Sequence, residues 1–183
     1  MGKKFAVGLV LLLFPIFLHA QAVSPVTPKL ATINAGGYFS YGQMDYGQHH
    51  NIGLGAYGDF DYRIWREVGV GIEGEARFMN FDEKSGVYDQ NFLGGPRVTY
   101  RLGRRWLPYV KFLAGGTRFH YPPFVSNQVY NYTTLAGGGG IDFKLNDRWT
   151  IRPADFEYQR LIDYPPTGLT PWVYSAGVSF RIF

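Results

Sequence analysis

The sequence predicts an all-β fold: an eight-stranded antiparallel up-and-down transmembrane β-barrel that follows a signal peptide. Three observations predict it. Apolar and polar residues alternate with a period of two along most of the chain, as in strands with two different faces. The 24 glycines and the aromatic content of 18% are typical of strands joined by turns. Short and long connections alternate between the strands, as they do in barrels that span a membrane.

Residues 1–22 form the predicted signal peptide. Lys3 and Lys4 precede an apolar run over residues 5–18, and small residues follow at Ala20 and Ala22. This order of basic, apolar and small residues is that of a secretory signal. The run is short for a membrane anchor, because a spanning helix needs about 20 residues. We expect cleavage after Ala20 or after Ala22, a lead-in at residues 23–29, and the barrel at residues 30–183.

Period-two alternation then predicts the strands in order. They are residues 30–41, 51–64, 68–79, 92–102, 108–121, 132–145, 149–160 and 172–182. The second is the clearest, with Ile52 and Leu54 on one face and Asp59 and Asp61 on the other. The seventh changes phase near Pro153, which predicts a β-bulge. A tilted strand crosses a bilayer with about 9–11 residues, so these lengths suit a membrane barrel.

The connections predict the orientation. Residues 42–50, 82–91, 122–131 and 162–171 are long and polar or contain proline, whereas residues 65–67, 103–107 and 146–148 are short. Outer-membrane barrels have short periplasmic turns and longer external loops. We therefore expect a bacterial outer-membrane location with both termini in the periplasm.

Tryptophans indicate which face meets lipid. Trp65, Trp106 and Trp149 lie at the three short turns, and Trp172 lies at the opposite end of its strand. Aromatic rings at those depths form an interfacial girdle in membrane barrels, whereas tryptophans of a soluble core belong nearer strand centres. This pattern predicts an apolar exterior and a polar lumen.

Charged residues on the polar faces predict a paired lumen, because an unpaired charge there is expensive. The predicted network comprises seven acids and seven bases: Asp59, Asp61, Arg63, Glu73, Glu75, Arg77, Arg97, Arg101, Lys111, Asp142, Lys144, Arg152, Asp155 and Glu157. An eight-stranded barrel is only wide enough for side chains to fill. We therefore predict that these side chains pair across strands and block flow.

Several short motifs resemble the OmpA-like, opacity-type outer-membrane β-barrel domains over residues 30–183. They are Gly-Gly-Tyr at 36–38, Gly-Pro-Arg-Val-Thr-Tyr at 95–100, Asp-Phe-Glu-Tyr-Gln-Arg at 155–160 and Gly-Val-Ser-Phe-Arg at 177–181. The resemblance implies a closing-strand signal at Phe180, Ile182 and Phe183, read by the barrel assembly machinery. Arg181 departs from the family pattern, which has an aromatic residue at that place.

No enzymatic, metal or cofactor site is predicted. A serine-histidine set would need His49, His50 or His120 close to Ser40 or Ser126, and a metal site at His49, His50 and Asp45 has no supporting spacing. The net charge of +4 is too weak to indicate nucleic acid, and the chain has no cysteine for a disulfide.

The predicted function is that of a non-enzymatic integral outer-membrane protein, with a structural lumen and external loops for envelope stability or surface interaction. The expected contacts are outer-membrane lipid and lipopolysaccharide, into which loop aromatics can anchor. Those aromatics are Tyr46, Tyr88, Tyr121, Phe124, Tyr130 and Tyr164. A narrow channel for ions or small solutes is the alternative, and a soluble exported lipocalin-like binder is a second one.

Overall fold

The computed structural model describes residues 30–43, 50–80, 88–120, 128–165 and 167–182 as a closed antiparallel β-barrel. Its strands are β1 (Ala31–Gln43), β2 (His50–Arg63), β3 (Val68–Asn80), β4 (Tyr88–Tyr100), β5 (Trp106–His120), β6 (Val129–Lys144), β7 (Trp149–Leu161) and β8 (Trp172–Arg181). The prediction of an eight-stranded antiparallel barrel is confirmed for these residues. The predicted signal peptide and lead-in lie outside them.

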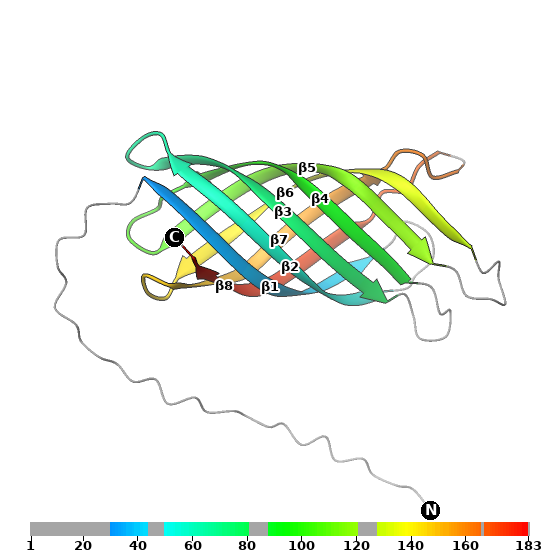
Figure 1. The fold of residues 1–183 in the computed structure, drawn as a ribbon, viewed down its shortest axis with the longest axis horizontal. Helices are drawn as coiled ribbons and strands as arrows, with labels where there is room; N and C mark the ends of the chain where they lie inside the picture. Colours follow the sequence, from blue (N-terminus) through cyan, green and yellow to red (C-terminus); the bar gives the residue numbers. More distant parts are fainter. Residues whose placement is uncertain (1–29, 44–49, 81–87, 121–127, 166, 183) are drawn as a thin grey trace, which may run out of the picture.

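Each strand pairs with its neighbours in the chain, and β1 closes the barrel against β8. The closing register runs from Asn34 opposite Arg181 to Gln43 opposite Trp172. Closure removes the sheet edges, so the backbone groups bond within the wall, which lipid requires because it offers no hydrogen bonds. Figure 1 shows the strands tilted around a common axis, with the start of β1 and the end of β8 at the end that carries the three short turns.

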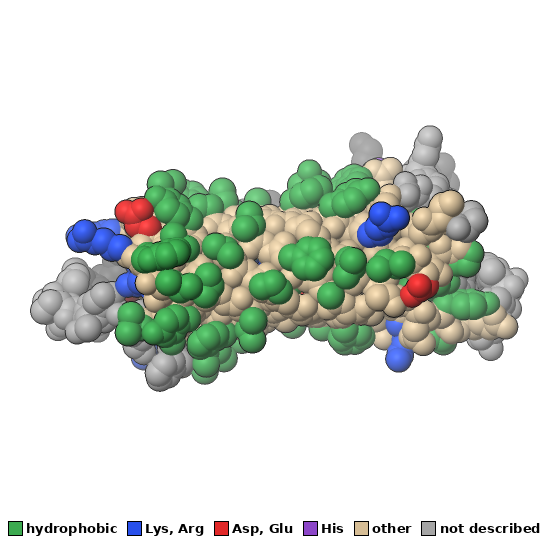
Figure 2. Space-filling view, turned by 90° about the horizontal axis from the view of Figure 1, so that it is seen from above, with side chains coloured by type: hydrophobic (Ala, Val, Ile, Leu, Met, Phe, Trp, Pro, Cys, Tyr) green, Lys and Arg blue, Asp and Glu red, His purple; other side chains and the backbone are tan. Residues whose placement is uncertain are grey.

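The outer wall is apolar and the interior is polar. Leu54 is 67% exposed on the outside, whereas Arg77 is 1% exposed on the inside. Figure 2 shows hydrophobic side chains over the wall, with basic and acidic ones near its two ends. A lipocalin-like binder has the opposite pattern, so that alternative was wrong. Among the described residues, no helix is long and apolar enough to cross a membrane.

The strands extend further than predicted at the end opposite the short turns, which we call the long-loop end. β2 begins at His50, β4 at Tyr88 and β6 at Val129, in segments that the sequence predicted as loops. The segments looked like loops because they are polar. Their inward positions face a lumen that is itself polar, as buried Asp89 and Asn91 show.

A β-bulge lies in β7, as the phase change near Pro153 predicted. The register with β8 shifts between Arg152 and Asp155, and the register with β6 shifts over the same part of β7. Residues three apart in a regular strand point to opposite faces. The extra residue instead turns both Arg152 and Asp155 inward, where the Arg152 Nη1 atom lies 3.2 Å from Asp155 Oδ2.

Candidate functional site

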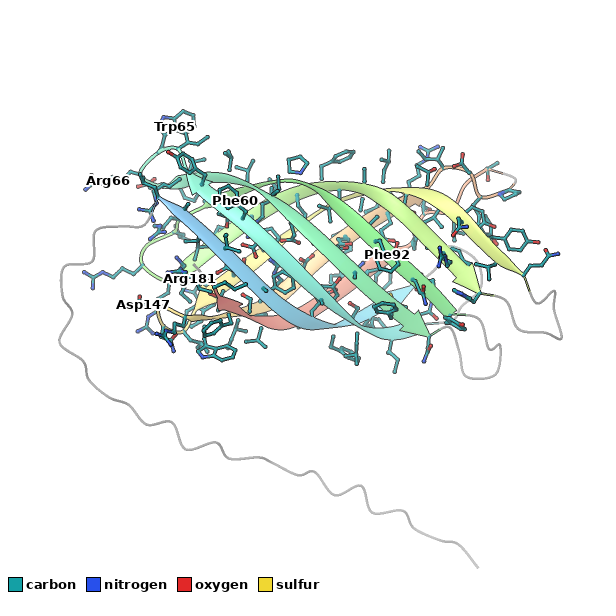
Figure 3. The ribbon with its side chains drawn as sticks, viewed as in Figure 1. Phe60, Trp65, Arg66, Phe92, Asp147 and Arg181 are labelled. Carbon is teal, nitrogen blue, oxygen red and sulfur yellow. The ribbon has the colours of Figure 1, made fainter. Side chains whose placement is uncertain are left out.

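A cluster of charged side chains fills the middle of the lumen, and we call it the lumen cluster. Its members are Asp59, Asp61, Glu73, Glu75, Arg77, Arg97, Lys111, Asp142, Arg152, Asp155 and Glu157. They come from β2 through β7, at positions that the alternation of each strand buries inside the barrel. Figure 3 draws side chains on both faces of the strands. The structure thus brings together eleven of the fourteen charged residues that the sequence assigned to the lumen.

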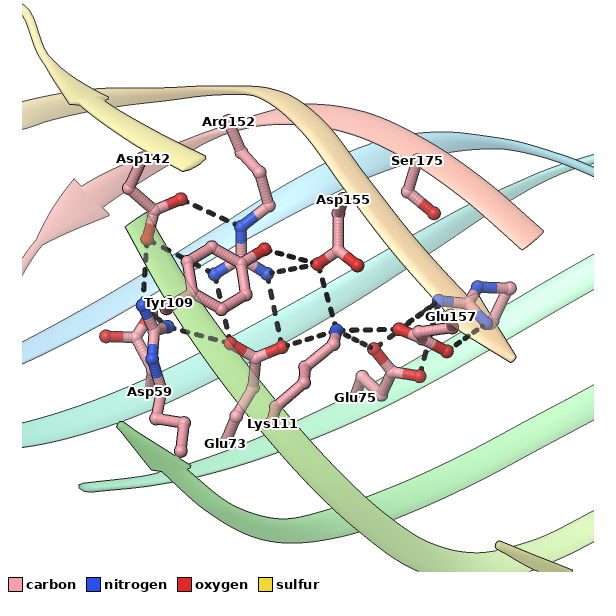
Figure 4. Close-up of polar contacts among 12 residues, drawn as sticks. Asp59, Glu73, Glu75, Tyr109, Lys111, Asp142, Arg152, Asp155, Glu157 and Ser175 are labelled. Carbon is pink, nitrogen blue, oxygen red and sulfur yellow. Dashed lines mark hydrogen bonds and ion pairs between the residues drawn. The ribbon is translucent and has the colours of Figure 1, made fainter. Parts of the chain in front are cut away.

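Glu73 lies at one centre of this cluster. Its carboxylate receives Arg97 Nη1 at 2.7 Å, Lys111 Nζ at 2.9 Å and Arg152 Nη2 at 3.0 Å. These partners belong to β4, β5 and β7, so the contacts cross the lumen as well as joining neighbouring strands (Figure 4). Three cations on one carboxylate satisfy its lone pairs, which is the condition for holding a buried charge.

Arg77 and Glu157 form the second centre. The guanidinium donates to both carboxylate oxygens at 2.9 Å, in the bidentate geometry that suits this pair. Arg77 is on β3 and Glu157 on β7, which are not neighbours in the barrel. Lys111 joins the two centres, because its Nζ also lies 2.6 Å from Glu157 Oε1.

Two tyrosines that the sequence analysis left out of the network complete it. The Arg152 guanidinium carbon lies 3.9 Å from the centre of the Tyr57 ring and 4.7 Å from that of Tyr109. The Tyr109 hydroxyl donates to Asp155 Oδ2 at 2.5 Å. Such stacking stabilises a desolvated cation. The signal was present in the sequence, since both tyrosines occupy the polar phase of their strands.

The remaining three predicted members lie elsewhere. Arg63, Arg101 and Lys144 make no ion pair with a described residue and line a pocket at the short-turn end, together with Arg181. The numbers of acids and bases, equal over the predicted network, are therefore unequal within the lumen cluster. In the lumen cluster, seven carboxylates face four cations.

Neutral side chains close the lumen toward the long-loop end. Thr117 lies between Asn91 and Thr134, with its hydroxyl 2.6 Å from that of Thr134. Beyond this layer, Phe119, Leu161 and Leu169 form an apolar cap, 0 to 4% exposed. Leu169 enters the mouth because residues 161 and 169 pair, which folds the connection that the sequence predicted as an external loop back onto the barrel.

Aromatic residues of the outer wall lie at both ends. Trp65, Trp106 and Trp149 are exposed at the short-turn end. Trp172 is partly buried at the long-loop end, where its ring packs against Tyr174 at 5.3 Å. Among the predicted closing-strand residues, Phe180 packs on Trp149 at 5.1 Å and Ile182 is exposed, while Phe183 lies outside the described residues.

The histidines do not meet a serine among the described residues. His50 stacks on Tyr41, and His120 stacks on Tyr88 with ring centres 4.4 Å apart. Ser40 hydrogen-bonds to Ser175 inside the lumen, at 2.8 Å. No group of three side chains suited to a metal occurs in the part of the chain that the structure describes. Three residues considered for such sites, Asp45, His49 and Ser126, lie outside that part.

The aromatics predicted for the loops divide into three groups. Tyr88 and Tyr130 belong to strands β4 and β6, so their assignment to loops was wrong for the reason given above. Tyr164 packs against Phe119 and Tyr132 beside the apolar cap. Tyr46, Tyr121 and Phe124 lie outside the described residues.

The barrel has an apolar exterior and a charged interior. Comparison with protein families finds a match that spans most of the chain. Residues 8–181 match the model of the outer membrane protein beta-barrel domain. The chain belongs to this family. The resemblance to OmpA-like barrels is thereby confirmed, and the protein is an outer-membrane β-barrel of bacterial type.

Solved structures agree on the fold. Neisserial surface protein A is similar with a TM-score of 0.61 at 12% identity, covering 83% of this chain and 97% of that protein. The attachment invasion locus protein Ail of Yersinia pestis is similar with a TM-score of 0.55 at 19% identity, covering 83% and 97%. The N-terminal barrel domain of Pseudomonas aeruginosa OprF gives 0.50 at 14% identity, covering 81% and 97%. No curated protein matches the sequence.

Proposed function

We propose that this protein is a non-enzymatic outer-membrane barrel whose lumen is a structural plug, and whose long-loop end serves envelope stability or surface interaction. The observation that carries the proposal is the presence of two successive closures in the lumen. The lumen cluster crosses the interior with ion pairs, and the apolar cap lies between it and the long-loop end.

The physical argument concerns water. A continuous pathway for ions needs a hydrated route along the axis, but side chains fill the interior of an eight-stranded barrel. Leu113 and Phe119 are both 0% exposed on β5, one beside the cluster and one in the cap. An apolar constriction resists wetting and stops ions without any charge barrier. The two closures therefore act in series.

A non-catalytic role is supported by the contacts of the nucleophile and base candidates. Acyl transfer needs a serine within hydrogen-bond reach of its base. His50 and His120 stack on tyrosines, and the Ser40 hydroxyl is hydrogen-bonded to that of Ser175. The charged side chains of the lumen cluster contact one another, at distances of 2.6 to 3.5 Å.

For the orientation, we propose the short turns and both termini in the periplasm and the long-loop end outside, following the usual barrel pattern. The contacts proposed are bilayer lipid, lipopolysaccharide at the outer end, and the barrel assembly machinery during insertion. One similar protein bears the name attachment invasion locus protein, which supports a surface role for the outer end.

The absence of cysteine from the chain makes this orientation testable by labelling. On intact cells, a maleimide that cannot enter the periplasm should label a Thr167→Cys variant and leave Asp147→Cys unlabelled. Both residues are exposed, at the long-loop end and in a short turn respectively. Labelling of Asp147→Cys alone would reverse the proposed orientation.

A narrow channel is the second candidate, and two observations favour it. The excess of carboxylates over cations in the lumen cluster would attract cations. The pocket at the short-turn end also provides an open approach to the cluster, because Asp61 and Asp142 line both.

Planar-bilayer conductance separates the two functions. The folded protein, identified by its heat-modifiable migration, should insert and give no steady openings. The conductance of a Phe119→Ala/Leu161→Ala variant, which lacks the two fully buried side chains of the cap, is compared with that of Val110→Ala, a control on the outer wall. Steady cation-selective openings of the unmodified protein would overturn the plug and favour the channel.

A further inference from the structure

Four cations at the short-turn mouth of the lumen are not used by the proposed plug. They line one pocket: Arg63, Lys144 and Arg181 are the last residues of β2, β6 and β8, and Arg101 directly follows β4. None of them makes an ion pair with a described residue. Four cations beside three carboxylates leave the lining with one positive charge in excess, and the cations repel one another where no anion lies between them.

The carboxylates that share this pocket are engaged elsewhere. Asp142 accepts Arg97 Nη2 at 2.9 Å and Arg152 Nε at 2.9 Å, deeper in the lumen. Asp61 lies 3.5 Å from Arg97 Nε. Glu67 accepts the Tyr100 hydroxyl at 2.7 Å on the exposed surface. The mouth therefore presents a net excess of positive charge to whatever enters it.

A hydrogen-bond donor in the pocket also lacks an acceptor. The Nε atom of Arg181 is buried without a hydrogen-bond partner among the described residues. Partial burial, together with the charges of Arg63 and Arg181, lowers the pKa of the Arg101 guanidinium from its usual value. Arg181 is also the residue that departs from the aromatic pattern of the closing strand. An inward arginine at the mouth gives that departure a structural consequence.

We propose that this pocket binds a phosphate group. Its four cations approach from four strands, which suits a tetrahedral anion whose oxygens point in several directions. Thr99 and Thr150 add hydroxyl donors to the lining. The cavity volume of the pocket is about 50 Å³, which suits a small group such as phosphate. In the orientation proposed above, the source is a periplasmic solute or a lipid headgroup of the inner leaflet.

Inorganic phosphate is the probe for the first test, by calorimetry of the folded protein in nonionic detergent at low salt. We expect saturable binding at one site. The variant Lys144→Gln/Arg181→Gln should bind about tenfold more weakly or worse, because two charge-assisted contacts are lost. The control Arg104→Gln/Arg105→Gln removes the same charge from an exposed turn at the same end and should bind as the unmodified protein does.

Two outcomes would overturn the proposal. One is the absence of saturable phosphate binding by a barrel whose heat-modifiable migration shows that it is folded. The other is equal weakening by the pocket and turn variants, which would mean diffuse attraction to a basic surface. Because the four cations of the pocket are not members of the lumen cluster, the binding test and the conductance test of the plug can fail separately.

A second measurement separates the sources of the phosphate. Native mass spectrometry of the protein released from phosphatidylglycerol nanodiscs should show one retained lipid if a headgroup fills the pocket, and the pocket variant should lose it. If phosphate binds and no lipid is retained, the ligand is a free solute. Both of these results support the phosphate site and differ only in its source.

Discussion

Glu73 illustrates how a buried charge is held at the scale of single residues. Its two oxygens receive three cations from three other strands within 3.0 Å. A carboxylate so surrounded is stabilised by its partners, but each partner is also desolvated and depends on it. Removal of the central charge therefore takes one acceptor from each of Arg97, Lys111 and Arg152 at once.

We predict that Glu73→Gln lowers the free energy of unfolding by about 3–5 kcal/mol, the usual cost of breaking a buried ion pair from one side. Urea unfolding of the protein folded into lipid vesicles, followed by tryptophan fluorescence, measures the change. Glu67→Gln is the matched control, since Glu67 is exposed at the short-turn end and accepts a hydrogen bond from the Tyr100 hydroxyl. Equal stability of the two variants would contradict the account.

Close approach between strands β6 and β7 shows how one element is shaped by small residues. At Gly138, which lies opposite Glu157, a Cβ atom would lie 2.2 Å from the carbonyl oxygen of Phe156. At the neighbouring Gly137, a Cβ would meet nothing within 4 Å. Glycine is thus required at one position and replaceable at the next.

Accordingly, Gly138→Val should prevent folding or destabilise the barrel by about 3 kcal/mol or more, because the obstacle is backbone and cannot move aside as a side chain can. Gly137→Val should fold normally and migrate as a heat-modifiable band. Gel electrophoresis without boiling, after refolding into detergent, compares the two. Normal folding of Gly138→Val would show that β6 and β7 are not so close.

The elements also show what alternation can and cannot predict. The apolar set on β2 and the phase change at Pro153 were enough to place strand β2 and the bulge, because each depends on local order in the chain. The starts of β2, β4 and β6 were not predicted, since a polar inward position such as Asn91 looks like a loop residue until the lumen is known to be polar.

At the scale of the whole molecule, the sequence predicts which charges face inward but not which of them meet. Alternation assigns both Arg77 and Arg63 to the lumen. Arg77 binds Glu157, however, whereas Arg63 lines the pocket at the short-turn end. Partners depend on the stagger between strands and on depth along the axis, and neither is visible in the order of residues. Leu169 was missed for the same reason, because its place in the cap follows from the way a connection folds back.

The central claim is that ion pairs hold non-neighbouring strands together across the lumen, and a double-mutant cycle between Arg77 and Glu157 tests it most directly. Unfolding in lipid vesicles would be measured for Arg77→Gln, Glu157→Gln and the double variant. We predict a coupling energy of about 1.5 kcal/mol or more, with Arg77→Gln and Glu67→Gln additive within about 0.5 kcal/mol as the control. If Arg77 and Glu157 were additive as well, the two side chains would not meet in the lumen, and the plug would lose its basis.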